Sequence, residues 1–404
     1  MSSERTVTRN VIVDATPRLV FQVLTETGNL RDWFCDTAWS DPRPGGRYAL
    51  HWAQGYHVEG RFLEIDPPRR AVVTWHGTGE PGETRVAFEL QEQDGGVNVQ
   101  VVHSGFGPGS EWDEAEAQAR RGWDAGLENL KSTVETGIDL RTARQPFLGI
   151  HLDLLTPERA ARENIAAQWG IYVEGVVDGS GAQAAGLGHS DVIVSLGGMP
   201  TNSFEELGAA LRARQAGDTV EVERVRGQAR DTLQVTLGSR PQPELPDSAP
   251  ALADRLAERQ REANDALRAV LENVSDQEAS LSPGEGDWSV REVLAHLSEN
   301  ERAFQMILSN LAVTGYLDGG PFYPDEIPGR LESILIVTPT VQGLLDRFLV
   351  DEAESEAFVR RLPETAVAYK ARFRRIANQV LALPDHVVQH VEQIRQALAG
   401  VRDR

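Results

Sequence analysis

The sequence predicts a multidomain chain with an α+β helix-grip fold, then a β-rich domain with helices, then an all-α up-down four-helix bundle. Three observations support this order. Residues 1–140 hold alternating, strand-like segments followed by one long amphipathic helix. Residues 146–240 hold short apolar strands separated by glycine-rich turns, and residues 247–404 show apolar positions with helical periodicity.

Length and linkers support the division into three domains. A chain of 404 residues is too long for a single hydrophobic core. The proline-rich stretch from Gly238 to Pro250 cannot continue a helix or a central strand, and Ile138–Pro146 forms a weaker break. We therefore expect domains at 1–140, 146–240 and 247–404.

Charge and cysteine content exclude several classes of protein. The net charge of −21 repels phosphate backbones and anionic membranes, so we expect neither nucleic acid nor a membrane as a partner. Cys35 is the only cysteine, which excludes an internal disulfide framework and a zinc-finger pattern. The first ten residues lack the apolar core of a signal peptide, and no apolar run is long enough to cross a bilayer. These features predict a cytoplasmic protein.

The first domain is predicted from five alternating strands and a closing helix. The strands are RYALHWA, YHVEGRFLEI, RAVVTW, TRVAFELQE and VNVQVVHSGF, after an initial strand TVTRNVIVDA. In the closing helix, apolar residues recur at i, i+4, i+7 and i+11, namely Trp123, Leu127, Leu130 and Val134. A curved antiparallel sheet wrapped around one long helix is a helix-grip fold.

This first segment resembles the START-like (SRPBCC) superfamily, in particular the branch named for activators of a heat-shock ATPase. The resemblance covers nearly all of the segment. It rests on the ATP-x3-VF stretch at Ala15–Phe21, Trp33, GGRY at Gly45–Tyr48, DPPRRAVVTW at Asp66–Trp75, HSGF at His103–Phe106 and GW-x3-L-x2-L at Gly122–Leu130. The name of this branch refers to chaperone activation, and we do not infer that activity for this chain.

The resemblance implies an apolar cavity between sheet and helix. We expect its lining to include Trp33, Tyr48, Trp52, His103 and Trp123, around an apolar small molecule. The other interpretation is a core filled by these side chains with no ligand. The residues of this segment show no paired carboxylates and no nucleophile next to a base.

The middle segment resembles a PDZ domain of the bacterial, HtrA-attached type. The motifs are FLGI at Phe147–Ile150, GSGAQAAGL at Gly179–Leu187, DVIVSLGG at Asp191–Gly198 and a helix at Ser203–Arg214, in the expected order. The resemblance implies that an extended peptide, such as a protein C-terminus, adds to the sheet beside this helix. No serine-protease domain accompanies it.

The peptide site follows from that mode of binding. The backbone N–H groups of Leu148, Gly149 and Ile150 would hold a terminal carboxylate. Side-chain specificity would come from the helix face with Phe204, Leu207 and Leu211. The alternative is that the FLGI loop only starts a strand and binds nothing. The helix-forming stretch Thr156–Ala167 is expected to cover part of the groove.

Three histidines in the last segment predict a metal site. His386 and His390 lie four residues apart, which places both on one helix face. Ser289 and Glu292 form a capping box that starts a second helix, on which His296 lies. Three imidazoles with an open fourth position suit zinc or nickel. The alternative is three separate histidines, each bonded to a carboxylate or carbonyl.

The segment from about Asp247 resembles the DinB family of metal-binding four-helix bundles. The motifs are DWSVREVLAHL at Asp287–Leu297 and HVVQHVEQI at His386–Ile394. The family's usual ligands map onto His296, His386 and His390. One departure is Pro384, which is expected to kink or start the last helix two residues before His386.

Two functional classes follow. The first is a bacterial, cytoplasmic binding protein with an apolar pocket, a peptide groove and a metal site. The second is a metal-dependent hydrolase or thiol-dependent transferase in the last domain, as the DinB resemblance implies. Spacing identifies no catalytic residue, and neither Glu299 nor Glu392 is clearly on the metal face. Whether the chain catalyses a reaction, and whether it forms a homodimer, stays open at this point.

Overall fold

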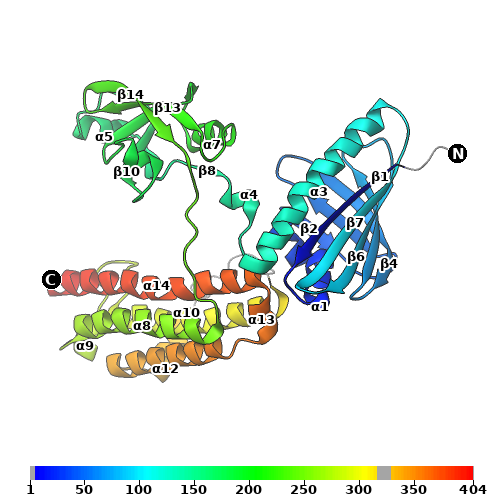
Figure 1. Ribbon diagram of the computed structural model, residues 1–404. Helices are drawn as coiled ribbons and strands as arrows, with labels where there is room; N and C mark the ends of the chain where they lie inside the picture. Colours follow the sequence, from blue (N-terminus) through cyan, green and yellow to red (C-terminus); the bar gives the residue numbers. More distant parts are fainter. Residues whose placement is uncertain (1–4, 316–328, 404) are drawn as a thin grey trace. The chain divides into compact units, whose positions relative to one another are not determined.

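The computed structural model describes residues 5–315 and 329–403, which form two compact units. The first unit contains residues 1–137 and 244–404, and the second contains residues 138–243. The first unit holds the helix-grip domain and the helical bundle, and the second holds the β-rich domain (Figure 1).

The helix-grip domain is a seven-stranded antiparallel sheet around one long helix. Its strands are β1 (Arg5–Val13), β2 (Thr37–Ser40), β3 (Arg47–His51), β4 (His57–Asp66), β5 (Arg70–Gly77), β6 (Thr84–Gln93) and β7 (Gly96–Phe106). They are ordered β1-β7-β6-β5-β4-β3-β2, so that the first strand pairs with the last. Helices α1 (Pro17–Thr25) and α2 (Thr27–Trp33) follow β1, and α3 (Ser110–Thr136) closes the domain, before the short helix α4 (Leu140–Ala143) of the second unit.

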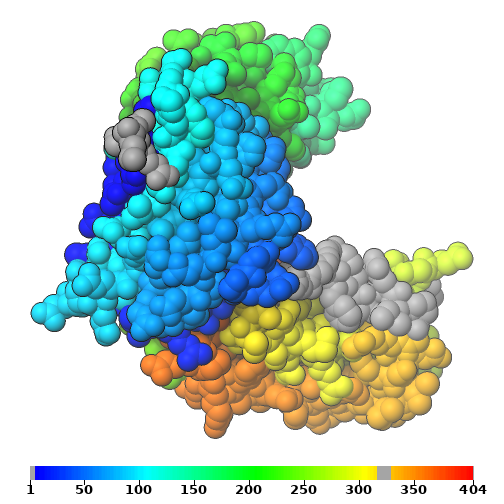
Figure 2. All heavy atoms as spheres, turned by 90° about the vertical axis from the view of Figure 1, so that its right-hand side faces the viewer, coloured from blue at the N-terminus to red at the C-terminus, as the bar shows by residue number. Residues whose placement is uncertain are grey.

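Alternation along the strands places the core of this domain between the sheet and α3. In β7, Val97, Val99, Val101 and His103 are buried, while the residues between them are less buried. Trp123 and Leu130 of α3 complete the cluster from the other side. Figure 2 shows the surface of this domain in blue and cyan.

The β-rich domain has a main sheet ordered β14-β13-β11-β10-β9, with β12 paired to β11. The strands are β8 (Pro146–Phe147), β9 (Ile150–Leu154), β10 (Ile171–Val176), β11 (Asp191–Leu196), β12 (Met199–Pro200), β13 (Thr219–Arg226), β14 (Ala229–Thr236) and β15 (Gly238–Ser239). Its helices are α5 (Pro157–Arg162), α6 (Gly181–Ala184) and α7 (Phe204–Arg212). β9 is therefore an edge strand of the path.

The C-terminal domain is a bundle of four long helices. These are α8 (Ala249–Leu271), α10 (Val290–Thr314), α12 (Val341–Arg360) and α14 (Lys370–Arg402), with short helices α9 (Asp276–Ala279), α11 (Arg330–Val337) and α13 (Glu364–Ala368) between them. The capping box of Ser289 and Glu292 is present, and α10 begins at Val290 as expected.

The helix directions differ from simple up-down alternation. The N-terminal parts of α10 and α12 share one apolar cluster with the C-terminal parts of α8 and α14. Helices α10 and α12 are thus parallel, and the order is up-down-down-up. The long connection between Thr314 and Val341 permits this arrangement, because it is long enough to return along the bundle.

Pro384 lies inside α14, and the helix neither starts nor ends there. The ring leaves the Val380 carbonyl without its usual intrahelical donor. At the next residue, Arg259 of α8 donates to the Leu381 carbonyl, and it also pairs with Asp385. Contacts from α8 therefore support the part of α14 that contains the proline.

The two domains of the first unit meet at the start of α14. Tyr369 and Ala371 belong to the apolar cluster of the helix-grip domain, and Arg375 forms an ion pair with Asp32 of α2. Burial raises the pKa of the Asp32 carboxyl, although Arg375 opposes that shift.

Among the described residues, no single helix has the length and apolar content needed to cross a bilayer, and the bent pair α11–α12 meets that test only jointly.

Candidate metal centre and binding surfaces

Three histidine side chains converge between helices α10 and α14. His386 Nε2 lies 3.2 Å from His296 Nε2 and 3.1 Å from His390 Nε2. Helix α10 contributes His296, and successive turns of α14 contribute the other two. The structure therefore brings together the three residues that the sequence singled out, with their Nε2 atoms facing one another.

The spacing of these nitrogens fits a tetrahedral metal ion. Zinc–nitrogen bonds of about 2.0–2.1 Å imply roughly 3.3–3.4 Å between two nitrogens at tetrahedral corners. The observed separations of 3.1 and 3.2 Å come close to this value. All three ligand atoms lie within 4.8 Å of one another. The donor set is thus compatible with a divalent transition metal and leaves a fourth position for water or another ligand.

Neighbouring side chains orient the imidazoles. His390 Nδ1 lies 2.7 Å from Gln393 Oε1, so that Nδ1 carries the proton and Nε2 keeps its lone pair for a metal. The Trp288 ring packs against His296, with their centroids 5.0 Å apart. His296 is buried, whereas His386 and His390 are half-buried, so the site is accessible from the α14 side.

The two glutamates near the ligands in sequence have other partners. Glu299, one turn beyond His296, is buried and forms an ion pair with Arg330. Glu392 is exposed and pairs with Arg395. Neither contact places a carboxylate against the three nitrogens, so the described residues identify no general base.

The residues expected to line the first domain's pocket do lie together. Trp33, Tyr48 and Trp123 are buried in one cluster, and Trp52 is packed against it. His103 is also buried, and its ring lies against those of Trp75 and Trp123. Phe34, which the sequence argument missed, stacks on both Trp33 and Trp123, at centroid distances of 4.5 and 5.1 Å. These rings contact one another directly. An apolar ligand at this place therefore requires them to move apart.

His103 has a defined tautomer in this core. Trp123 Nε1–H donates to His103 Nδ1 at 3.2 Å, so Nδ1 is an acceptor. Thr84 donates its hydroxyl to the Trp75 carbonyl and lies 2.7 Å from His103 Nε2, which must carry the proton. Burial lowers the pKa of His103 to about 3. The imidazole is therefore neutral at physiological pH.

The predicted peptide site of the β-rich domain involves β9 and α7. β9 pairs with β10 on one side only, so its other edge is available for an added strand. Ile150, Leu207 and Leu211 pack on the same cluster as Leu148. Phe204, at the start of α7, is 49% exposed. Among the described residues, apolar side chains of β9 and α7 thus share one cluster, and β9 ends the strand order of the sheet.

Gly149 has a packing role in addition to the predicted contact with a carboxylate. Its φ is +87°, and a Cβ at this position would lie 2.2 Å from the Ser180 Cβ. Its carbonyl accepts hydrogen bonds from Val177 N–H and the Ser180 hydroxyl. A side chain at position 149 would therefore displace the loop from α6, beyond any effect on an anion.

The stretch Thr156–Ala167 does not cover the groove as expected. Helix α5 lies in this stretch, and Ala160, Ile165 and Ala167 pack with Tyr172 and Val192 in a second apolar cluster. The neighbours Ile171 and Ile193 belong to the groove-side cluster instead. Because successive strand residues point to opposite faces, α5 lies on the face of the sheet away from the groove.

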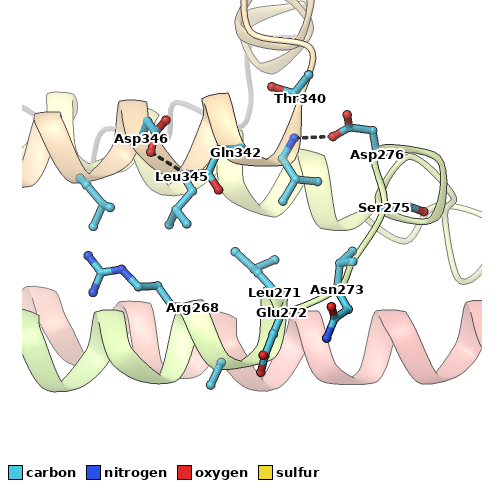
Figure 3. A pocket seen from close by; sticks show the side chains of 14 residues that line it. Arg268, Leu271, Glu272, Asn273, Ser275, Asp276, Thr340, Gln342, Leu345 and Asp346 are labelled. Atoms are coloured by element: carbon cyan, nitrogen blue, oxygen red, sulfur yellow. Dashed lines mark hydrogen bonds between the residues drawn. The ribbon is translucent and has the colours of Figure 1, made fainter.

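A surface cavity that the sequence did not indicate lies between α8 and α12. It has a volume of about 1130 Å³, and its lining includes Leu271, Leu345 and Arg268 (Figure 3). Asp276 accepts a hydrogen bond from Val341 N–H at the start of α12. The cavity is on a different helix pair from the three histidines, which lie between α10 and α14.

Three protein-family models match successive segments of the chain. Residues 14–135 match the activator of Hsp90 ATPase homolog 1-like proteins, residues 146–237 match the PDZ domain, and residues 259–394 match the DinB superfamily. The chain therefore combines an Hsp90-ATPase-activator-like helix-grip domain, a PDZ domain and a DinB-superfamily bundle.

Curated relatives match in part. The chain is 33% identical over 100 residues to the periplasmic pH-dependent serine endoprotease DegQ of Escherichia coli, covering 25% of this chain and 22% of that protein. It is 28% identical over 136 residues to the putative serine protease HhoB of Synechocystis, covering 32% of each chain. The chain thus spans less than a third of the length of either relative.

Solved structures that resemble part of the chain include two small proteins. The Aha1 dimer from Colwellia psychrerythraea is 18% identical with a TM-score of 0.29, covering 32% of this chain and 96% of that one. CalU16 from Micromonospora echinospora is 23% identical with a TM-score of 0.29, covering 33% of this chain and 75% of that one.

Proposed function

We propose that this protein binds one divalent metal ion through His296, His386 and His390, and binds an extended peptide through its PDZ domain. The observation that carries the metal assignment is the convergence of three Nε2 atoms at 3.1–3.2 Å. Zinc or nickel is the proposed ion, because imidazole nitrogens suit both. In this proposal the protein is first a binding protein, with an apolar small molecule as a third ligand in the helix-grip domain.

Elemental analysis tests the metal assignment. The full-length protein, purified without added metal, should contain about one zinc or nickel per chain, and the His390→Ala variant should contain far less. His76→Ala is the matched control, because His76 is exposed and lies on strand β5, outside the histidine group. Equal metal content in the parent and the His390→Ala variant would show that the site is misassigned.

The peptide part of the proposal rests on β9. An edge strand next to the apolar side of α7 is the arrangement that strand addition uses. Protein C-termini are the proposed partners, with the amides of Leu148, Gly149 and Ile150 as the carboxylate site. Peptide binding is separable from metal binding, since the two sites lie in different compact units.

Catalysis in the DinB-superfamily bundle is the second candidate function. Three neutral imidazoles would leave a coordination position at which a metal can activate a water or a thiol. The half-buried state of His386 and His390 favours this, because a substrate can approach from their side. Turnover of a thiol-conjugated substrate by the metal-loaded protein tests it, with the chelated protein and His390→Ala as controls.

The proposal places the protein in the bacterial cytoplasm. The two curated relatives share about a quarter to a third of this chain, so their own location does not decide this one. Fractionation of cells that express the native chain, followed by immunodetection, is the direct test. Recovery in the periplasmic fraction would contradict this part of the proposal.

A further inference from the structure

A polar layer crosses the core of the bundle between its two apolar clusters. One cluster is built on Leu267, Leu297 and Phe348, and the other on Leu256, Leu308 and Val359. The residues between them come from α8, α10 and α12, and all are buried. The polar layer consists of Gln260, Asn264, Ser298, Glu301, Asp351, Glu352 and Ser355.

The Asp351 carboxylate of the polar layer has both a hydroxyl donor and a cation beside it. Asp351 accepts a hydrogen bond from the Ser298 hydroxyl and a charged one from Arg302 Nε at 3.2 Å. Gln305 bonds both the Asp351 carbonyl and the Ser355 hydroxyl. This part of the layer has donors and a cation for its negative charge, as a buried carboxylate requires.

The other two carboxyl groups of the layer, Glu301 and Glu352, have fewer hydrogen-bond donors around them than Asp351. Asn264 Nδ2 donates to Glu352 Oε2 across the α8–α12 contact. In the part of the chain that the structure describes, Glu301 Oε1 and Asn264 Oδ1 are buried acceptors without a hydrogen-bond partner, and Gln260 Nε2 is a buried donor without one. Among the unpaired atoms of the layer, two are acceptors and one is a donor, and leaving buried polar atoms unpaired is destabilising.

Protonation of Glu301 and Glu352 would supply the missing hydrogen-bond donors. A carboxylic acid donates one hydrogen bond, whereas a carboxylate only accepts. Burial, opposed by the Ser355 hydroxyl and helped by the nearby Asp351 charge, raises the pKa of Glu301 to about 7. Burial likewise raises the pKa of Glu352 to about 8, with Asn264 lowering it and Glu301 raising it.

We propose that Glu301 and Glu352 form a buried proton-binding pair that makes the opening of the bundle pH-sensitive. With protons bound, the pair is neutral and each acid donates to an acceptor of the layer. When both protons leave, two negative charges face each other in the apolar interior, and the contacts among α8, α10 and α12 weaken. This device goes beyond the proposed metal and peptide functions and does not depend on them.

The charged groups around the pair do not offset its ionisation. On α8, Arg268 acts on Glu352 from a half-exposed position and pairs with Asp265. On α10, Arg302 is paired with Asp351 of α12. From α14, the buried residues near this level are apolar, including Val380 and Val387, and Asp385 is bound by Arg259 at the surface.

Hydrogen exchange of the full-length protein tests the proposal. Exchange of α10 and α12 amides, corrected for the intrinsic pH dependence, should accelerate as the pH rises from about 5 to about 8 and level off above that. The reason is that the opened chain ionises these carboxyls at about pH 4.3, whereas the folded pair holds its protons up to about pH 7 and 8. The increase should reach roughly tenfold per pH unit for each ionising group. The double variant Glu301→Gln/Glu352→Gln should lose this acceleration. Glu354→Gln, an exposed change on the same helix, should keep it.

A second measurement keeps the test decisive if the double variant folds poorly. Infrared difference spectra of the parent protein between pH 6 and pH 9.5 should show loss of protonated-carboxyl absorption, reduced in Glu352→Gln alone. Unchanged exchange and unchanged spectra across this range would overturn the proposal. Protection of α10 and α12 by added Mn²⁺, absent in the Gln variants, would also overturn it, by identifying a cation site instead.

Discussion

The Nε2 atoms of His386 and His390 lie 3.1 Å apart on successive turns of α14, and His296 Nε2 lies 3.2 Å from the first of them. Unprotonated Nε2 atoms at this spacing repel one another unless a proton or a cation lies between them. A bound metal removes this repulsion. Metal binding by the three histidines should therefore raise the free energy of unfolding of the bundle.

Metal removal should lower the thermal stability of the bundle. Bound metal adds RT ln(1 + [metal]/Kd) to the free energy of unfolding, or about 2.7 kcal/mol at a hundredfold excess over Kd. We expect the parent protein to lose this stabilisation on chelation, as measured by calorimetry. The His390→Ala variant should show no such loss, since it has little metal to remove. A chelator effect of equal size in both proteins would contradict the assignment.

Gln393 should act as a positioning residue for His390. Its Oε1 accepts from His390 Nδ1 at 2.7 Å, which fixes the tautomer and the ring. Gln393→Ala should weaken metal affinity by roughly 10–100-fold, the usual effect of losing such a partner. Gln393→Glu should retain affinity, because it keeps an acceptor. Competition titration with a metal-binding dye measures both, and Gln396→Ala, an exposed change on α14, is the control.

The PDZ domain should distinguish a free peptide C-terminus from an amidated one. Amidation removes the charge that the amides of Leu148, Gly149 and Ile150 would bind. Phe204→Ala should weaken binding by removing an exposed apolar contact of α7, while its neighbour Glu205→Ala should have little effect. Fluorescence titration of the full-length protein tests this. Equal affinity for amidated and free peptides would mean that the loop does not read carboxylates.

Gly149→Val is a less informative variant for that experiment than Phe204→Ala. A valine side chain at position 149 would crowd an anion held by the loop amides. A Cβ at position 149 would lie 2.2 Å from the Ser180 Cβ, and the φ of Gly149 is +87°, so Gly149→Val would strain the loop itself. Reduced binding by Gly149→Val would therefore not separate the two causes, and Phe204→Ala is the sharper test.

His103 should make the helix-grip domain acid-sensitive. Its folded pKa of about 3 lies below the unfolded value of about 6.5, so the unfolded chain binds more protons between these values. Stability is fully present above pH 6.5 and falls by up to roughly 1.4 kcal/mol per pH unit toward pH 3. His103→Gln should flatten this part of the profile in denaturant titrations. An unchanged slope below pH 6.5 would show that other groups dominate.

An apolar ligand should bind the helix-grip domain only with rearrangement of its aromatic core. Trp33, Phe34 and Trp123 stack directly, so we expect slow binding of apolar probes and a change in tryptophan fluorescence. Phe34→Ala should create a cavity, cost about 3–5 kcal/mol of stability and speed up binding. If probes bind neither the parent nor the variant, the filled-core interpretation holds.

The sequence alone determined the order and type of the three domains. Strand alternation, helical periodicity and the motifs around Gly149, His296 and His386 are local features, and local features can be read from neighbouring residues. Spacing of i and i+4 also placed His386 and His390 on one helix face. The capping box at Ser289 likewise followed from residues three positions apart.

Only the tertiary structure decided which distant residues meet. The approach of His296 to His386 depends on how α10 packs against α14, 90 residues further along the chain. The same holds for Glu301, Asn264 and Glu352, which lie on three helices and have no shared motif. The parallel course of α10 and α12, which brings them into one layer, is set by packing of apolar faces, and no short-range pattern encodes it.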